Sequence, residues 1–217
     1  MRKFFLMSMV LFAALLASAQ QDIKAKNILD EVSKKAQSYK SISASFVFTM
    51  QNKEMDINEK NSGTIKLKGK KYVVNLPDIG VKVYSDGKTV WNYMKDGNQV
   101  TISNIDDQSN ELMDPSSLFS IYEKGYKSKY VGEKKEGNKI YDQIDLFPEK
   151  EDVQDVSKVT ILIDKSTMMI HSAEMYTTDG NIYGVLVKKM DTDKDFPDSD
   201  FVFNPSDYKD VEIIDLR

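Results

Sequence analysis

The chain has 217 residues, of which 30 are basic and 34 acidic, with no cysteine and a single histidine. Without cysteine it can form neither a disulfide nor a thiolate metal site, so its core alone has to stabilise the fold. Its formal net charge of −4 argues against nucleic-acid binding, which usually needs a basic surface.

The N-terminal residues are typical of an exported protein. Arg2 and Lys3 precede an apolar run over residues 4–17, which ends in the small residues Ala17-Ser18-Ala19. This layout predicts a signal peptide that is cleaved after residue 19, with an N-terminal membrane anchor as the alternative. No later stretch approaches the roughly 18 apolar residues that a membrane helix needs.

The next part of the sequence predicts one helix followed by strands. Between Asp22 and Lys40 apolar residues recur at spacings of three, four and seven, which predicts an amphipathic helix. The period then changes to two in "SASFVFTM" and "GTIKLKGKKYVVNL". The Asp-Gly pairs at 86–87 and 96–97 supply the turns of tight hairpins. We therefore expect a meander of antiparallel strands from about Ser41 to Ser103.

A lysine run accompanies the second of these strands. Lys66 and Lys68 alternate with Ile65 and Leu67 in a pattern that is typical of a strand with one solvent-exposed face. We expect Lys66, Lys68, Lys70 and Lys71 to form a solvated face rather than a binding patch.

The second half of the chain predicts a short helix and more strands. In "DPSSLFSIYEKG" Asp114 can cap a helix, Pro115 fits its first position and Gly125 can end it. Alternation then predicts strands at Tyr126–Glu133, Lys139–Phe147, Lys158–Asp164, Met168–Thr177, Ile182–Met190 and Phe201–Phe203. With no internal repeat or linker, residues 20–217 are predicted to form a single α+β domain.

Motifs for catalysis or metal binding are missing. No serine sits in a Gly-x-Ser-x-Gly elbow, and His171, on a predicted strand, is expected at the surface or at a pocket rim. The acidic stretch "DTDKDFPDSD" lacks the glycine and the bidentate glutamate of a calcium loop. We expect neither an enzyme nor a bound cofactor or metal; a hydrolase whose acid pair is defined only in space is a minor alternative.

Methionines and aromatic residues indicate an apolar cavity. Methionine suits surfaces that accommodate variable apolar shapes, and beyond the signal peptide it occurs at Met50, Met55, Met94, Met113, Met168, Met169, Met175 and Met190. Together with aromatic strands and a short apolar helix, these residues suit a cavity for a lipid-like ligand. Ordinary core packing is the alternative for each of them.

The order of these elements resembles the periplasmic outer-membrane lipoprotein carriers, the LolA-like proteins. The resemblance covers essentially the whole chain after the signal peptide and rests on an ordered series of loose motifs: "SASFVF", "GTIKLKGKKYVV", "VYSDGKTVWNY", "DPSSLFSIY", "YDQIDLFPEK", "VTILIDKSTMMI", "TTDGNIYGV" and "FVFNPSDYKDVEII". It implies an incomplete antiparallel β-barrel of about eleven strands, with the N-terminal and mid-chain helices covering its open side.

The same resemblance implies a function in the periplasm. Such a carrier holds the acyl chains of a lipoprotein in its apolar interior, receives them from an inner-membrane ATP-driven transporter and passes them to an outer-membrane acceptor. No cofactor is used, and we expect a monomer. The alternative is a lipid- or lipoprotein-sensing half-barrel with a regulatory role, which would usually carry a second domain.

Strand alternation combined with the resemblance assigns the residues of the site. The acyl-chain cavity is expected to be lined by Phe46, Phe48, Met50, Ile65, Leu67, Tyr72, Val74, Leu76, Trp91 and Tyr93. The mid-chain helix is expected to act as a lid that fills the empty cavity and moves aside on loading, through Leu118, Phe119, Ile121 and Tyr122. A filled core without ligand is the alternative.

One position departs from the family pattern. The family commonly has an arginine, which ties the lid to the barrel, just after the strand that matches Gly63–Lys68. Here the residues are Lys68, Gly69, Lys70 and Lys71. Lysine lacks the planar fork of donors that arginine provides, so the lid latch is not transferred to this chain.

Overall fold

The computed structural model describes residues 22–107, 125–149 and 155–217, which form one helix and one large sheet. The N-terminal helix spans residues 22–38, and short 3-10 turns are η1 (Pro77–Ile79), η2 (Ile105–Asp107), η5 (Asp198–Phe201) and η6 (Pro205–Asp207). The strands are β1 (Ile42–Asn52), β2 (Ile57–Lys68), β3 (Lys71–Leu76), β4 (Val81–Ser85), β5 (Thr89–Met94), β6 (Gln99–Asn104), β7 (Tyr126–Glu136), β8 (Lys139–Pro148), β9 (Val156–Asp164), β10 (Met169–Thr177), β11 (Ile182–Thr192) and β12 (Glu212–Asp215).

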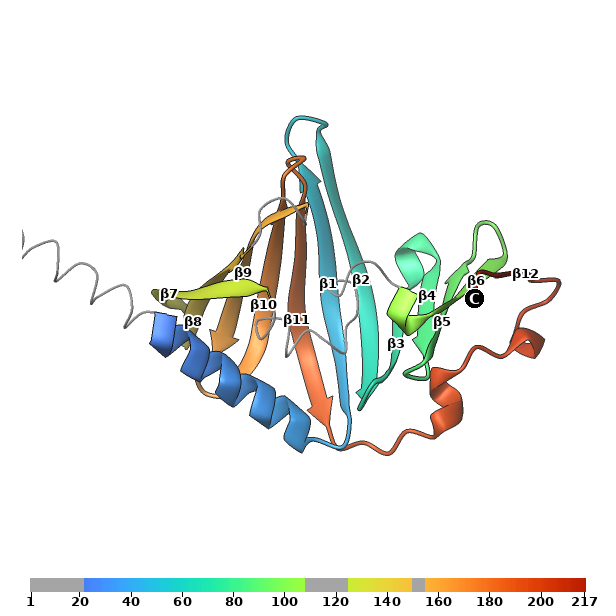
Figure 1. Cartoon of the computed structure of the whole chain (residues 1–217), viewed down its shortest axis with the longest axis horizontal. Coiled ribbons are helices and arrows are strands. Elements are labelled where there is room, and N and C mark those ends of the chain that lie inside the picture. The colour runs from blue at the N-terminus through green and yellow to red at the C-terminus, as the bar shows by residue number, and fades with distance from the viewer. Residues whose placement is uncertain (1–21, 108–124, 150–154) are drawn as a thin grey trace, which may run out of the picture.

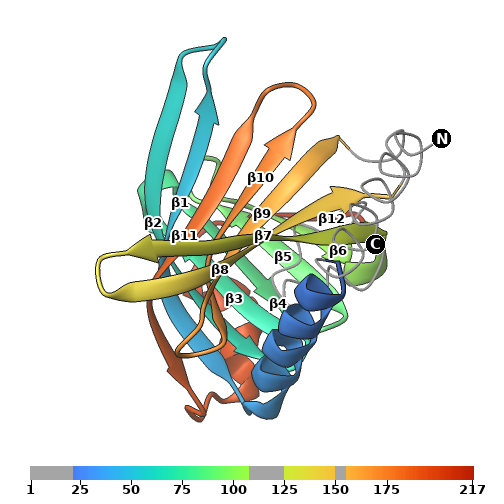
Figure 2. The ribbon, with the colours of Figure 1, turned by 90° about the vertical axis from the view of Figure 1, so that its left-hand side faces the viewer.

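The sheet joins two meanders at the pair β1–β11. Its strand order is β12-β6-β5-β4-β3-β2-β1-β11-β10-β9-β8-β7, so β12 and β7 are its two edges and the sheet is not closed into a barrel. All pairs are antiparallel except β12–β6, which is parallel. Figure 2 shows the strands fanning around a curved surface instead of lying in one plane. The predicted open barrel in an α+β fold is thus confirmed, with twelve strands in place of about eleven.

The register of the strands defines two faces of the sheet. Residues that lie opposite each other in an antiparallel pair point to the same side. Ile42 pairs with Leu67 and Leu67 with Tyr72, and all three pack with Ala36 of the N-terminal helix. We call the side on which this helix packs the inner face and the opposite side the outer face.

The N-terminal helix covers one end of the inner face. Its apolar stripe buries Ala25, Leu29 and Val32 against residues of β8 and β9, among them Ile144 and Ile161. Figure 1 shows the helix running diagonally from β7 and β8 to the start of β1. No helix among the described residues is long and apolar enough to cross a membrane.

The C-terminal segment, residues 193–211, covers the outer face of the half of the sheet that contains β3 to β6. Phe201 and Phe203 are buried against Tyr84 and Val100. The predicted strand at Phe201–Phe203 is wrong. Phe201 ends the 3-10 turn η5, and the alternation of the two phenylalanines reflects side chains that pack on the sheet without strand pairing.

Ion pairs attach this segment to the lysine run. Lys66 binds Asp200 at 2.7 Å, while Lys68 and Lys71 bind Asp198 at 3.0 and 2.6 Å. Lys68 also donates to the carbonyl oxygen of Phe196 at 2.7 Å. These three lysines are half-buried on the outer face, so the prediction of a solvated face was wrong for them.

Candidate functional site

The ten residues predicted to line a cavity fall into three groups. Leu67 and Tyr72 are fully buried beneath the N-terminal helix, and Ile65 and Val74 pack against the same cluster. These four inner-face residues form part of the core. The second group lies on the inner face farther from the helix, and the third group lies on the outer face.

The second group forms the candidate site. Phe46, Phe48 and Met50 on β1 and Leu76 on β3 share the inner face and are half-buried. The start of β1 at Ile42 contacts the helix cluster, and Met50 lies eight residues along the strand, or roughly 26 Å away. The helix therefore covers the end of the inner face near Ile42, whereas these four residues lie toward the tip of the β1–β2 hairpin, which protrudes at the top of Figure 1.

Neighbouring strands extend this apolar surface. In register, Phe46 pairs with Val187, Phe48 with Val185 and Met50 with Tyr183 on β11. Met175 on β10 lies opposite Tyr183. We call the eight half-buried residues the apolar strip: Phe46, Phe48, Met50, Leu76, Met175, Tyr183, Val185 and Val187.

Strand alternation did not identify Tyr183, Val185 and Val187 on β11, whereas Met175 on β10 was among the methionines expected to suit a cavity. In "IYGVLVKKM" apolar residues occupy both alternating positions, so the period of two does not select a face. A register shift between Ser45 and Phe46, where β1 meets β11, changes the alternation again. Only the pairing with β1 assigns these side chains to the inner face.

Close packing shapes the strip around Phe46. A methyl group added at Gly63, the partner of Phe46 on β2, would lie 2.5 Å from the Phe46 ring and 2.8 Å from Leu76. The missing side chain therefore leaves room over β2 for the Phe46 ring and for the Leu76 side chain from β3. Beside it, Phe48 and Tyr183 stack with ring centroids 6.3 Å apart.

A buried amide pair holds the two hairpin tips that carry the strip. Asn52, at the end of β1, donates to Asn181, just before β11, at 2.9 Å. The Asn52 side-chain oxygen accepts from the backbone N–H groups of Glu54 and Met55. Because buried amides are costly to leave unpaired, these bonds fix the β1–β2 and β10–β11 tips next to each other.

The third group consists of Trp91 and Tyr93, which the structure does not bring together with the others. Trp91 pairs with Tyr84, and both Trp91 and Tyr93 pack in the outer-face cluster with Phe203. The expectation that they share a face with each other holds, but their assignment to the inner face was wrong. On β5 it is Val90 and Asn92 that point inward, because they follow the register from Ser85 and Val83.

The outer-face cluster is closed by the C-terminal aromatic residues. The Tyr93 ring lies 4.3 Å from that of Tyr208, and the hydroxyls of Tyr84 and Tyr208 are 2.8 Å apart. Burial raises the pKa of both Tyr84 and Tyr208, so both phenols stay neutral and share this hydrogen bond. This side of β4 and β5 is a filled core.

Comparison with known proteins agrees with this architecture. The sequence matches the family described as outer membrane lipoprotein carrier protein LolA over residues 37–204. The chain belongs to the LolA family. No curated protein sequence is matched by this chain.

Solved structures share the fold of this LolA-family chain at low sequence identity. An uncharacterized conserved protein from Thermus thermophilus is similar with a TM-score of 0.60 and 16% identity, over 88% of this chain and 99% of the other. A LolA superfamily protein from Nitrosomonas europaea gives 0.45 and 13%, over 82% and 97%. At 16% identity the similarity to the Thermus thermophilus protein shows the fold alone.

Some predicted features of the LolA-family chain cannot be placed. The predicted lid residues Leu118, Phe119, Ile121 and Tyr122, like the predicted signal peptide, lie outside the described residues. Within the described part of the chain, no group of three or more histidine, aspartate or glutamate side chains is arranged to hold a metal ion.

Proposed function

We propose that this chain is a periplasmic carrier that binds the acyl chains of lipoproteins on the apolar strip and shuttles them from the inner to the outer membrane. It is exported by the predicted signal peptide, residues 1–19, and acts as a single domain over residues 20–217. It receives its cargo from an ATP-driven inner-membrane transporter and hands it to an outer-membrane acceptor. Membership in the LolA family and the layout of the N-terminus support this proposal.

The observation that carries the proposal is the half-buried apolar strip on the inner face. Burying an acyl chain gains about 0.8 kcal/mol per methylene, or on the order of 10 kcal/mol for a whole chain before opposing costs. Large apolar groups that are left partly accessible on a sheet are suited to this cargo. The side chains of Phe48, Met50 and Tyr183 offer a mixture of rings and a flexible thioether against which a methylene chain can pack.

The regulatory alternative differs in what happens after binding. A sensor would hold a lipid or lipoprotein and change its contacts with a partner protein, without releasing cargo from a membrane. Transfer of cargo is therefore the property to measure.

A release assay with two neighbouring substitutions tests the carrier proposal. The purified chain is added to inner-membrane vesicles that contain a labelled lipoprotein and the ATP-driven transporter, and the label in the soluble fraction is measured. Phe48→Glu places a charge on the apolar strip, and we expect release to fall at least about tenfold, since an unpaired carboxylate costs several kcal/mol beside an acyl chain.

Val47→Glu is the matched control. Val47 precedes Phe48 on β1 but points to the outer face. We expect near-normal release from Val47→Glu and circular dichroism close to that of the parent protein for both variants. Equal release by both variants, or no release by the parent protein, contradicts the carrier proposal.

A further inference from the structure

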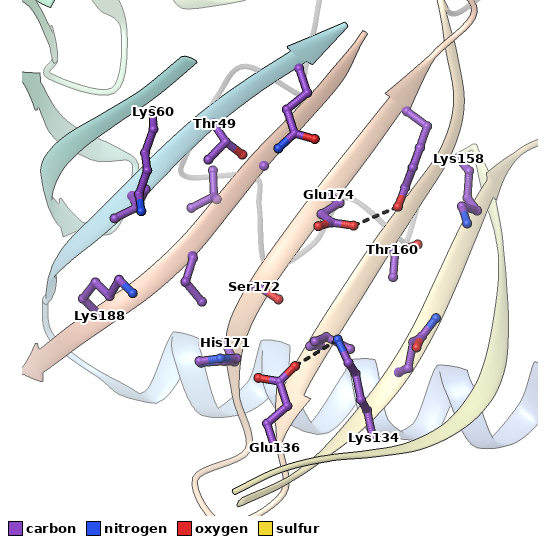
Figure 3. A pocket seen from close by; sticks show the side chains of 18 of the residues that line it. Thr49, Lys60, Lys134, Glu136, Lys158, Thr160, His171, Ser172, Glu174 and Lys188 are labelled. Atoms are coloured by element: carbon purple, nitrogen blue, oxygen red, sulfur yellow. Dashed lines mark hydrogen bonds and ion pairs between the residues drawn. The ribbon is translucent and has the colours of Figure 1, made fainter. Parts of the chain in front are cut away.

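The outer face carries a polar pocket that the proposed function does not use. Its volume is about 580 Å³, and it lies over β1, β2 and the strands β7 to β11. Figure 3 shows it from close by, with the N-terminal helix behind the sheet. The apolar strip lies on the other side of the same strands β1, β10 and β11. The size of the pocket is within the range of small-molecule sites.

Lysines dominate the charge of this pocket. Four of them line it, on β2, β7, β9 and β11, together with two glutamates: Lys60, Lys134, Lys158, Lys188, Glu136 and Glu174. The whole chain has a formal net charge of −4, so the pocket reverses the sign of the molecule. A concave site of one sign concentrates ligands of the opposite charge.

Two of the four lysines are available to a ligand. Lys134 binds Glu136 at 2.9 Å, and Lys158 lies 3.7 Å from Asp145. Across the described ranges 22–107, 125–149 and 155–217, Lys60 and Lys188 have no ion pair. An anion at the β2–β11 side of the pocket therefore meets ammonium groups that no carboxylate already neutralises.

The lysines stand on opposite sides, with hydrogen-bonding groups between them. In Figure 3 Lys60 and Lys188 lie on one side, Lys134 and Lys158 on the other, and Ser172 and Glu174 are between the two pairs. A carboxylate in the centre repels a phosphate but accepts hydrogen bonds from sugar hydroxyls. The lysines at the sides of the pocket therefore favour phosphate groups, and the centre of the pocket favours hydroxyl groups of the same ligand.

His171 adds a neutral group to the pocket. Its ring stacks on that of Tyr141, with centroids 4.4 Å apart, and it is half-buried. Burial lowers the pKa of His171, so at neutral pH the imidazole offers one donor and one acceptor.

We infer that this outer-face pocket binds a phosphorylated saccharide or polyol, with one phosphate at Lys60 and Lys188 and hydroxyls toward Ser172, Glu174 and His171. A second phosphate takes the place of Glu136 and Asp145 as the partner of Lys134 and Lys158. Lysine is a point-charge partner for phosphate. Such a ligand is either a free sugar phosphate or the headgroup of a membrane lipid. The inference is independent of the acyl-chain proposal, because the two surfaces lie on opposite faces of the sheet.

Calorimetric titration of the chain without its signal peptide tests the pocket. The probes are glucose, glucose 6-phosphate and glucose 1,6-bisphosphate. We expect affinity to rise with each phosphate and to fall as salt increases. The variant Lys60→Gln/Lys188→Gln should bind the bisphosphate on the order of tenfold more weakly, because two unpaired ammonium groups are removed.

Lys209→Gln is the control for the lysine variant. Lys209 is exposed and precedes the edge strand β12, at the end of the sheet away from the pocket strands. It should leave the affinity unchanged. Equal affinity for glucose and glucose 1,6-bisphosphate overturns the inference. So does an equal loss of bisphosphate affinity in Lys60→Gln/Lys188→Gln and in Lys209→Gln.

Vesicles separate the two sources of the ligand. Flotation with vesicles that display a diphosphorylated sugar headgroup supports a lipid ligand if the chain floats and Lys60→Gln/Lys188→Gln does not. Bisphosphate binding without flotation supports a soluble ligand. Neither binding nor flotation overturns the inference.

Discussion

Gly63 shows how one residue determines the shape of the candidate site. Its position on β2 lies directly opposite Phe46, whose ring occupies the space where a side chain would stand. The same space is bordered by Leu76 from β3. The strip therefore depends on a missing methyl group as much as on the apolar side chains that line it.

We expect Gly63→Ala to lower the free energy of unfolding by about 1–3 kcal/mol, because the new methyl group forces the Phe46 ring out of its position. Urea denaturation measures the change. The matched control is Gly97→Ala, whose added methyl group would come no closer than 3.8 Å to Gln99. A Gly63→Ala protein as stable as Gly97→Ala would show that Phe46 moves freely and that its placement is not fixed by packing.

Sequence alternation predicted the face of the site residues on β1 but not of those on β5, where the register of the intervening strands decides. Alternation within β1 was enough to group Phe46, Phe48 and Met50 on one face, as the structure confirms. Alternation within β5 grouped Trp91 with Tyr93 but could not say which face they take. That choice depends on the register through β2, β3 and β4, and on a C-terminal aromatic cover far along the chain.

At the scale of elements, the C-terminal segment is the least strand-like part that still contributes to the core. Phe201 is fully buried although its segment pairs with no strand, and lysines of β2 and β3 bind Asp198 and Asp200, which precede it. These ion pairs remain partly accessible to water and contribute little each. Burial of the Phe201 ring is therefore the main anchor.

Phe201→Ala should lower the free energy of unfolding by about 3–5 kcal/mol, since it removes a buried ring and leaves a cavity. Chemical denaturation followed by tyrosine and tryptophan fluorescence measures this loss. Phe147→Ala is the comparison, because Phe147 is 38% exposed, and we expect less than about 1 kcal/mol there. Similar losses for the two variants would mean that the segment is only loosely attached.

Elements with strong local periodicity were predicted well. The helix at residues 22–38 and strands β7 to β11 agree with the expected ranges to within three residues, and the expected meander from about Ser41 to Ser103 corresponds to β1 to β6. The short strand β12 was missed because its four residues, Glu212–Asp215, carry too little alternation and pair in parallel with β6. Its pairing depends on contacts between distant segments, which a local pattern does not contain.

At the scale of the whole molecule, one curved sheet presents different chemistry on its two faces. The inner face is apolar beneath the N-terminal helix, which covers one end of it, and along the half-buried apolar strip. The outer face carries a filled aromatic core at one end and the lysine pocket at the other. A single shift of register would exchange these faces, so the β1–β11 pairing that joins the two meanders determines which side chains of β10 and β11 lie on the inner face.

The central claim is that acyl chains bind the apolar strip, and site-specific photocrosslinking tests it most directly. A photoreactive phenylalanine analogue replaces Phe48 on the inner face or Trp91 on the outer face, and each protein is irradiated during the release assay. We predict lipoprotein crosslinks from position 48, mapped by mass spectrometry to the acyl chains, and none from position 91. Crosslinks from position 91 alone, or none from position 48 during active release, would contradict the account.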